Sequence, residues 1–187
     1  MIRLLAVLSF LCLVPVLRAA EPATHIDDPG RLLSADSAWT KGLEAKLAAF
    51  EHTAGVRILV RLHLKSPAEA EDKEPGAYMR SLATKLGVIR HGVLVVYFAD
   101  DPDWRVWIGD ELTSRFMGKA GTAKEFTESG AMHVTKEAFL QEAFAKADAT
   151  LAGLKKVAPK EAASAGMKIA LQADALADSL IDRLAPR

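Results

Sequence analysis

The fold is decided by the stretch GVLVVYFADDPDWRVWIGDEL, which covers Gly92–Leu112. It begins with a continuous apolar run, Val93–Ala99, and a run that is apolar on both faces is typical of a strand buried inside a sheet. Aspartates and a proline occupy positions 100–103, and an alternating run follows from Trp104 to Ile108. Because aspartate and proline favour turns, we predict a β-hairpin with three carboxylates at its tip.

Upstream of the hairpin, helical and strand patterns alternate. Apolar residues at helical spacing predict an amphipathic helix from Trp39 to Ala54, which Gly55 ends. Strict alternation predicts a half-buried strand over Val56–Leu64, and a second amphipathic helix covers Tyr78–Leu86. Two strands joined through a helix are expected to be parallel. We therefore predict a mixed sheet, parallel across the helix and antiparallel across the hairpin.

The second face of the strand at 56–64 is basic, with Arg57, Arg61 and His63. Two interpretations stay open for it. The side chains could bind an anion, or they could form a solvated or helix-shielded face whose long stems lie along apolar neighbours.

The composition limits the classes of function. The 187 residues are 50% hydrophobic and 26% charged, which suits one globular domain with an appendage. The 24 basic and 24 acidic side chains balance, so nothing favours a polyanionic partner, and we expect no nucleic-acid binding.

The first twenty residues have the layout of a secretory signal peptide. Arg3 supplies positive charge, Leu4–Leu17 is apolar, and Ala19 and Ala20 are small residues of the kind found at a cleavage site. We predict export to the periplasm or the medium, with the signal either cleaved or retained as an anchor. Cys12 is the only cysteine, so the mature chain would have none. We also expect no transmembrane helix in the mature chain.

The predicted organisation has three parts: a signal peptide at 1–20, an α/β domain at 21–156 and an alanine-rich helix at 157–187. A helical stripe between Leu140 and Leu154 precedes the last part. The final helix could pack on the domain, lie on a partner or pair with another copy.

The order of these segments resembles the TPM domain family over about Ile26 to Phe144. The residues that carry the resemblance are Asp28–Ser34, Thr53–Gly55, Val56–Val60, Gly92–Val96 and Asp101–Leu112. The resemblance implies an exported three-layer α/β/α sandwich with a central mixed sheet, here followed by C-terminal helices. Some family members bind divalent cations through acidic loops, plant thylakoid members have been described as acid phosphatases, and others act in photosystem repair or receptor assembly.

Carried over by position, Asp28 matches the family's acidic residue before the first helix, and Asp101 matches the one at the hairpin tip. Arg105 and Gly109 match the Arg and Gly of its second strand. The chain departs from the family at Pro102, where Arg is usual. It also departs at two further positions, Glu111 in place of Gly and His91 in place of Asn.

Asp28, Asp100, Asp101 and Asp103 are the candidate metal ligands. Carboxylate oxygens suit Ca²⁺ or Mg²⁺, so a cation site could form if the fold brings the two loops together. The alternative is that these aspartates only form turns.

Three functions stay open. We favour a non-catalytic binding or assembly module of the cell envelope, with an unknown protein partner and with a divalent cation bound at the acidic loops. The first alternative is a low-activity, divalent-cation-dependent acid phosphatase with Asp101 as nucleophile and Arg105 as phosphate clamp. The second is a structural or homo-oligomeric domain. Trp104 and Trp107 fall on opposite faces of one strand, so we expect one in the core and the other near the surface.

Overall fold

The computed structural model describes residues 24–33, 38–162 and 164–186. The predicted signal peptide at 1–20 lies outside the described residues.

A mixed four-stranded sheet forms the centre of the molecule, with the strands in the order β1-β2-β3-β4. The strands are β1 (Ile26–Asp27), β2 (Arg57–His63), β3 (Gly92–Phe98) and β4 (Asp103–Ile108). β1, β2 and β3 are parallel, and β4 returns antiparallel to β3 with Val95 opposite Val106. The predicted hairpin and the predicted mixed sheet are both confirmed.

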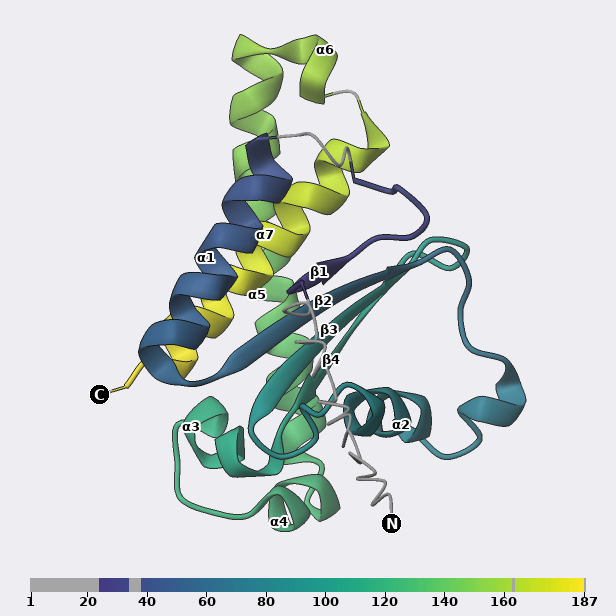
Figure 1. The fold of residues 1–187 in the computed structure, drawn as a ribbon, viewed down its shortest axis with the longest axis vertical. Helices are drawn as coiled ribbons and strands as arrows, with labels where there is room; N and C mark the ends of the chain where they lie inside the picture. The colour runs from purple at the N-terminus through teal and green to yellow at the C-terminus, as the bar shows by residue number, and fades with distance from the viewer. Residues whose placement is uncertain (1–23, 34–37, 163, 187) are drawn as a thin grey trace, which may run out of the picture.

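Helices cover both faces of the sheet, which gives three layers (Figure 1). α1 (Ala38–Ala54), α5 (Ala131–Val157) and α7 (Ala165–Leu184) share the larger core on one face. α2 (Ala77–Lys85) packs on the other face over a smaller core. The α/β fold class is therefore confirmed.

Short elements complete the chain. They are two 3₁₀ turns, η1 (Glu69–Glu71) and η2 (Asp110–Leu112), and three short helices, α3 (Thr113–Met117), α4 (Ala123–Glu128) and α6 (Pro159–Ala162). Within the described ranges, no helix combines the length and the apolar character that crossing a bilayer requires.

The two middle strands are buried on both sides. All seven residues of β3 are buried, as are five of the seven in β2. For β2 this differs from the half-buried strand that we expected, because Arg61 is only 7% exposed. Its guanidinium donates to backbone carbonyl oxygens of residues 25 and 60, at 3.0 and 2.9 Å, so the charge is hydrogen-bonded rather than solvated.

Close backbone packing explains the glycine that ends the hairpin. A Cβ atom at Gly109 would lie 2.4 Å from the carbonyl oxygen of Arg90 and 2.8 Å from that of Gly92. No side chain fits there without moving the backbone. Gly109 therefore lets the end of β4 lie against the segment that leads into β3.

The last helix, α7, contributes its whole apolar stripe to the larger core. Its buried residues include Ile169, Ala173, Leu176, Leu180 and Leu184. The Lys46 ammonium on α1 bonds to Asp174 and Asp178 of α7, each at 2.6 Å. In the structure α7 thus packs on α1 and α5 of the same chain.

We expect Leu180→Ala to lower the free energy of unfolding by about 2–5 kcal/mol, because it removes a fully buried side chain and leaves a cavity. Urea denaturation followed by circular dichroism measures this loss. Leu64→Ala is the matched control, since Leu64 is 56% exposed, and it should cost less than about 1 kcal/mol. Equal losses in the two variants would contradict the packing of α7.

Candidate functional site

The carboxyl ends of β1, β2 and β3 meet at one edge of the sheet because these strands are parallel. Asp28 follows β1 at this edge, while Asp100 and Asp101 follow β3 and Asp103 opens β4. β2 lies between β1 and β3, so the two loops start roughly 10 Å apart, twice the spacing of neighbouring strands. All four predicted ligands share the edge, but they belong to two separate loops.

Asp28 holds the loop that follows it. Its Oδ1 accepts the N–H of Leu32 at 2.8 Å, and its Oδ2 accepts the N–H of Leu33 at 2.7 Å. Arg31 between them has a φ of 51°, a left-handed conformation that costs a residue with a side chain about 1 kcal/mol. Both oxygens of Asp28 thus stabilise a strained turn.

Asp100 ties the hairpin tip to the loop after β2. Its Oδ1 accepts the backbone N–H of Ser66 at 2.8 Å, the Ser66 hydroxyl at 2.9 Å and the N–H of Asp101 at 3.0 Å. The hydrogen bond from the Ser66 hydroxyl is the largest of the effects that lower the pKa of Asp100. This carboxylate joins two loops across neighbouring strands.

Arg105 is held by two carboxylates on the face that α2 covers. It donates to Asp103 Oδ2 at 2.9 Å and to Asp72 Oδ2 at 2.6 Å, and its guanidinium lies 5.0 Å from the centre of the Phe98 ring. Burial lowers the pKa of Arg105, but the hydrogen bonds to Asp103 and Asp72 outweigh it and the net shift is upward. No described bond links Arg105 to Asp101, the pair that a phosphatase would use.

The described residues contain no group of three or more His, Cys, Asp or Glu side chains that could hold a metal ion. Asp28 uses both oxygens on backbone N–H groups, Asp100 uses Oδ1 on Ser66 and Asp101, and Asp103 uses Oδ2 on Arg105. The four aspartates therefore do not fit a single Ca²⁺ or Mg²⁺ site in this arrangement, and cation binding stays a prediction.

The basic side chains on the second face of β2 have partners of their own. Arg57 donates to Glu51 at 3.2 Å. His63 packs between the rings of Tyr78 and Phe98, with centroids 6.5 and 5.8 Å away. Burial lowers the pKa of His63 and so disfavours its charged form. With Arg61 bonded to carbonyl oxygens, these three residues do not form the anion site that we considered.

A second cluster, which the sequence analysis missed, anchors β1 to α1. His25 is 6% exposed, and its ring nitrogens lie 2.8 Å from Glu44 Oε1 and 2.7 Å from Glu51 Oε2. Glu44 also accepts the backbone N–H groups of His25 and Ile26, each at 3.0 Å. Burial raises the pKa of Glu44, but these bonds outweigh it and lower the pKa overall.

Only a weak sequence signal points to this anchor. Glu44 and Glu51 are seven residues apart, which places them on the same face of a helix. Nothing in the sequence connects that face with His25, which lies 19 residues before Glu44.

A groove runs along the outer edge of β1, between this strand and α1. Its volume is about 530 Å³, within the range of ligand sites. The groove is lined by Thr24, Ile26, Asp28, Thr40, Lys41, Glu44, Ala45 and Ala48. Ala45 and Ala48 are exposed and apolar, and they form its helical wall. We call this feature the α1–β1 groove.

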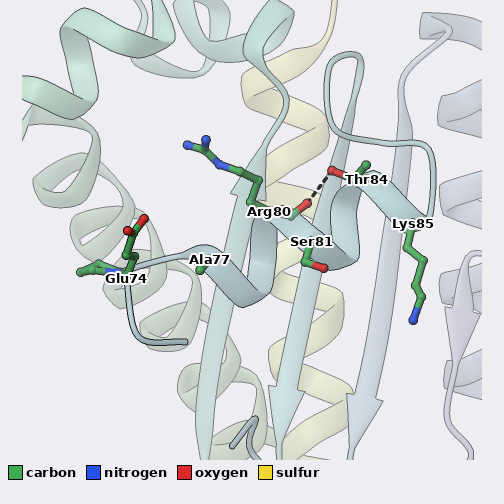
Figure 2. A pocket seen from close by; sticks show the side chains of 7 residues that line it. Glu74, Ala77, Arg80, Ser81, Thr84 and Lys85 are labelled. Atoms are coloured by element: carbon green, nitrogen blue, oxygen red, sulfur yellow. Dashed lines mark hydrogen bonds between the residues drawn. The ribbon is translucent and has the colours of Figure 1, made fainter. Parts of the chain in front are cut away.

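Another hollow lies along the outer side of α2, and Figure 2 shows the side chains that line it. Arg80 and Lys85 are its cations, and they point away from each other. The Thr84 hydroxyl is occupied by a hydrogen bond to the Arg80 carbonyl oxygen at 2.8 Å. The hollow therefore has no pair of cations that converge on one point where a ligand could bind.

The two tryptophans of β4 have different surroundings. Trp104 is 5% exposed and donates to Gln172 of α7 at 3.0 Å. Trp107 lies on the α2 side, with the Arg80 guanidinium 5.7 Å and the Lys136 ammonium 5.8 Å from its ring centre. Burial lowers the pKa of Lys136 to about 8. Among the described residues Lys136 has no ion-pair partner.

No family model, curated protein or solved structure matches this chain. The resemblance to the TPM domain family rests on the residues quoted from the sequence and stays a prediction.

We expect Asp28→Ala to lower the free energy of unfolding by about 1–3 kcal/mol, because two partly buried backbone N–H groups lose their acceptor. Asp28→Asn, which keeps one acceptor oxygen, should lose less. Urea denaturation in excess EDTA and in excess Ca²⁺ measures both. The loss should be the same in the two solutions, and a loss confined to the Ca²⁺ solution would identify Asp28 as a ligand.

We expect Lys136 to make stability depend on pH. Its pKa is about 8 in the folded protein and about 10.4 in an unfolded chain. Below pH 8 Lys136 is protonated in both the folded and the unfolded state, and the folded state bears the full cost of burying the charge. As the pH rises from 8 to 10.4, the folded state loses the proton first, so wild type should gain about 1–3 kcal/mol relative to Lys136→Met.

Urea denaturation at several pH values measures this difference, with Lys124→Met at an exposed position as the control. The difference between wild type and the control should stay flat across the same range. A flat difference for Lys136→Met as well would contradict the burial of its ammonium.

Proposed function

We propose that this protein is a non-catalytic binding or assembly module of the cell envelope, which holds a segment of a partner protein in the α1–β1 groove. The observation that carries the proposal is the contrast between the two candidate regions. At the acidic edge Asp28, Asp100 and Asp103 bond to neighbouring groups of the protein itself, and Asp101 is the one carboxylate there without a described partner. As far as the described residues show, the groove is open, and most of its lining surface is apolar. Export follows from the predicted signal peptide at 1–20.

The phosphatase alternative has less support. A phosphate clamp needs a cation that is free to meet the phosphoryl group, whereas Arg105 is bound by Asp103 and Asp72. Asp101 lies exposed at the hairpin tip, and no described contact brings a cation to it. No specific observation favours this reaction over binding.

The backbone of β1 decides how a partner would be held. The Ile26 N–H donates to Glu44 at 3.0 Å, and the Ile26 carbonyl oxygen accepts the Thr24 hydroxyl at 2.9 Å. These bonds close the outer edge of β1, so an added strand would find few free backbone groups. The partner segment is therefore held by side-chain contacts rather than by extension of the sheet.

The groove also suggests the chemistry of that segment. Ala45 and Ala48 leave room for apolar side chains on the helical wall. Lys41 is exposed at the rim and has no ion-pair partner among the described residues, whereas Glu44 and Asp28 are engaged by backbone N–H groups. A segment with apolar side chains and a carboxylate complements these charges.

Selection of random phage-displayed peptides on the full chain tests this proposal. We expect enriched peptides to combine apolar residues with at least one Asp or Glu. Ala45→Arg together with Ala48→Arg should weaken their binding at least about tenfold, because the two side chains fill the groove. Lys41→Glu should weaken binding by reversing the charge at the rim. Fluorescence anisotropy with the best labelled peptide measures each affinity.

Ala49→Arg is the matched control, because Ala49 is exposed on the same helix but does not line the groove. It should leave peptide affinity unchanged. Failure to enrich any peptide, or equal weakening by the control, would overturn the groove as the binding site.

A further inference from the structure

The end of α5 and the start of α6 form a helical tip that projects beyond the sheet (Figure 1). We call residues 154–160 the α5–α6 tip. α5 and α7 pack along their lengths, but the tip is at the far end of this pair from α3 and α4. None of the tip residues belongs to the α1–β1 groove.

The tip is basic. Between positions 150 and 168 the chain has four lysines and a single acidic residue, Glu161. Lys155, Lys156 and Lys160 are exposed, and none forms an ion pair with any residue whose side chain the structure describes, which leaves out Glu161. This concentration of charge contrasts with the chain as a whole, which has 24 basic and 24 acidic residues.

An exposed apolar side chain lies within this basic cluster. Val157, the last residue of α5, is 81% exposed, the largest fraction among the exposed large hydrophobic residues. A valine in that position contributes nothing to the core. The nearest lysines in the sequence are Lys156 before it and Lys160 after it.

Helix electrostatics explain only part of the cluster. Lys155 and Lys156 lie in the last turn of α5, where a positive charge is favourable because of the helix dipole. Lys160 belongs to α6, a helix of only four residues, whose dipole is too small to account for it. The dipole also gives no reason for the exposure of Val157.

We propose that the α5–α6 tip docks on an anionic phospholipid surface, with the lysines on the headgroups and Val157 at the boundary with the acyl chains. The tip projects from the molecule, and its residues line none of the hollows found among the described residues, which favours a flat lipid surface over an acidic protein. Lysines near an anionic membrane each strengthen binding about fivefold, and an inserted apolar side chain adds to this. The site is independent of the proposed function of the groove.

Co-sedimentation of the full chain with lipid vesicles tests the proposal. Vesicles of phosphatidylcholine mixed equally with phosphatidylglycerol should bind the protein, and the binding should weaken with added salt. Lys155→Glu, Lys156→Glu and Lys160→Glu together should reduce the partition coefficient about 100-fold, since three fivefold terms are lost. Val157→Ser should reduce it about threefold without changing the charge.

Lys65→Glu, Lys73→Glu and Lys85→Glu form the matched control. These lysines are also exposed, but they lie in the segment from β2 to α2. The control makes the same change in net charge, and residues 1–20 are common to all samples. The two triple variants therefore differ only in where the charges are reversed. The control should keep the wild-type partition coefficient, and circular dichroism should show that all variants are folded.

Equal loss in the tip variant and the control would overturn the proposal, since net charge alone would then explain binding. Equal binding by the tip variant and wild type would overturn it as well. Retention on immobilised polyglutamate without binding to the mixed vesicles would replace the lipid with an acidic protein surface.

Discussion

The whole structure depends on burying β3 from both sides. Its seven residues are apolar apart from the phenol of Tyr97, and all of them are buried. A strand of this kind cannot lie at an edge or face water, because about 25 cal/mol is lost for each Å² of apolar surface left exposed. It must have a strand on each side and a helical layer on each face. β2, β4, α2 and the group of α1, α5 and α7 meet those four requirements.

The order of α1, β2, α2, β3 and β4 was predictable from local patterns, whereas the two-residue strand β1 was not. The continuous run of β3 and the alternation of β4 specify their own burial, and the aspartates between them mark the turn. The second face of β2 was not predictable. Arg61 is buried only because carbonyl oxygens of residues 25 and 60 lie within reach of its guanidinium, and no periodicity records such a contact.

The candidate site, too, could be predicted from the sequence only in part. The sequence correctly places the hairpin tip at the end of a strand and Asp28 before the first helix, but it does not show that Leu32, Leu33 and Ser66 occupy their oxygens. The anchor at His25 depends on residues up to 26 positions away. The groove depends on that anchor, because its strand wall is positioned by Glu44. Features built from distant pairs of polar residues leave no repeating signal in the sequence.

The packing of α7 has a consequence for the order in which the protein can take shape. Leu184 is fully buried, and Lys46 pairs with Asp174 across 128 positions. The larger core therefore stays open at the ribosome until nearly all of the described chain has been made. For the export that the signal-peptide pattern predicts, that delay is favourable, since a chain that lacks its closing helix remains unfolded enough to pass through a narrow channel.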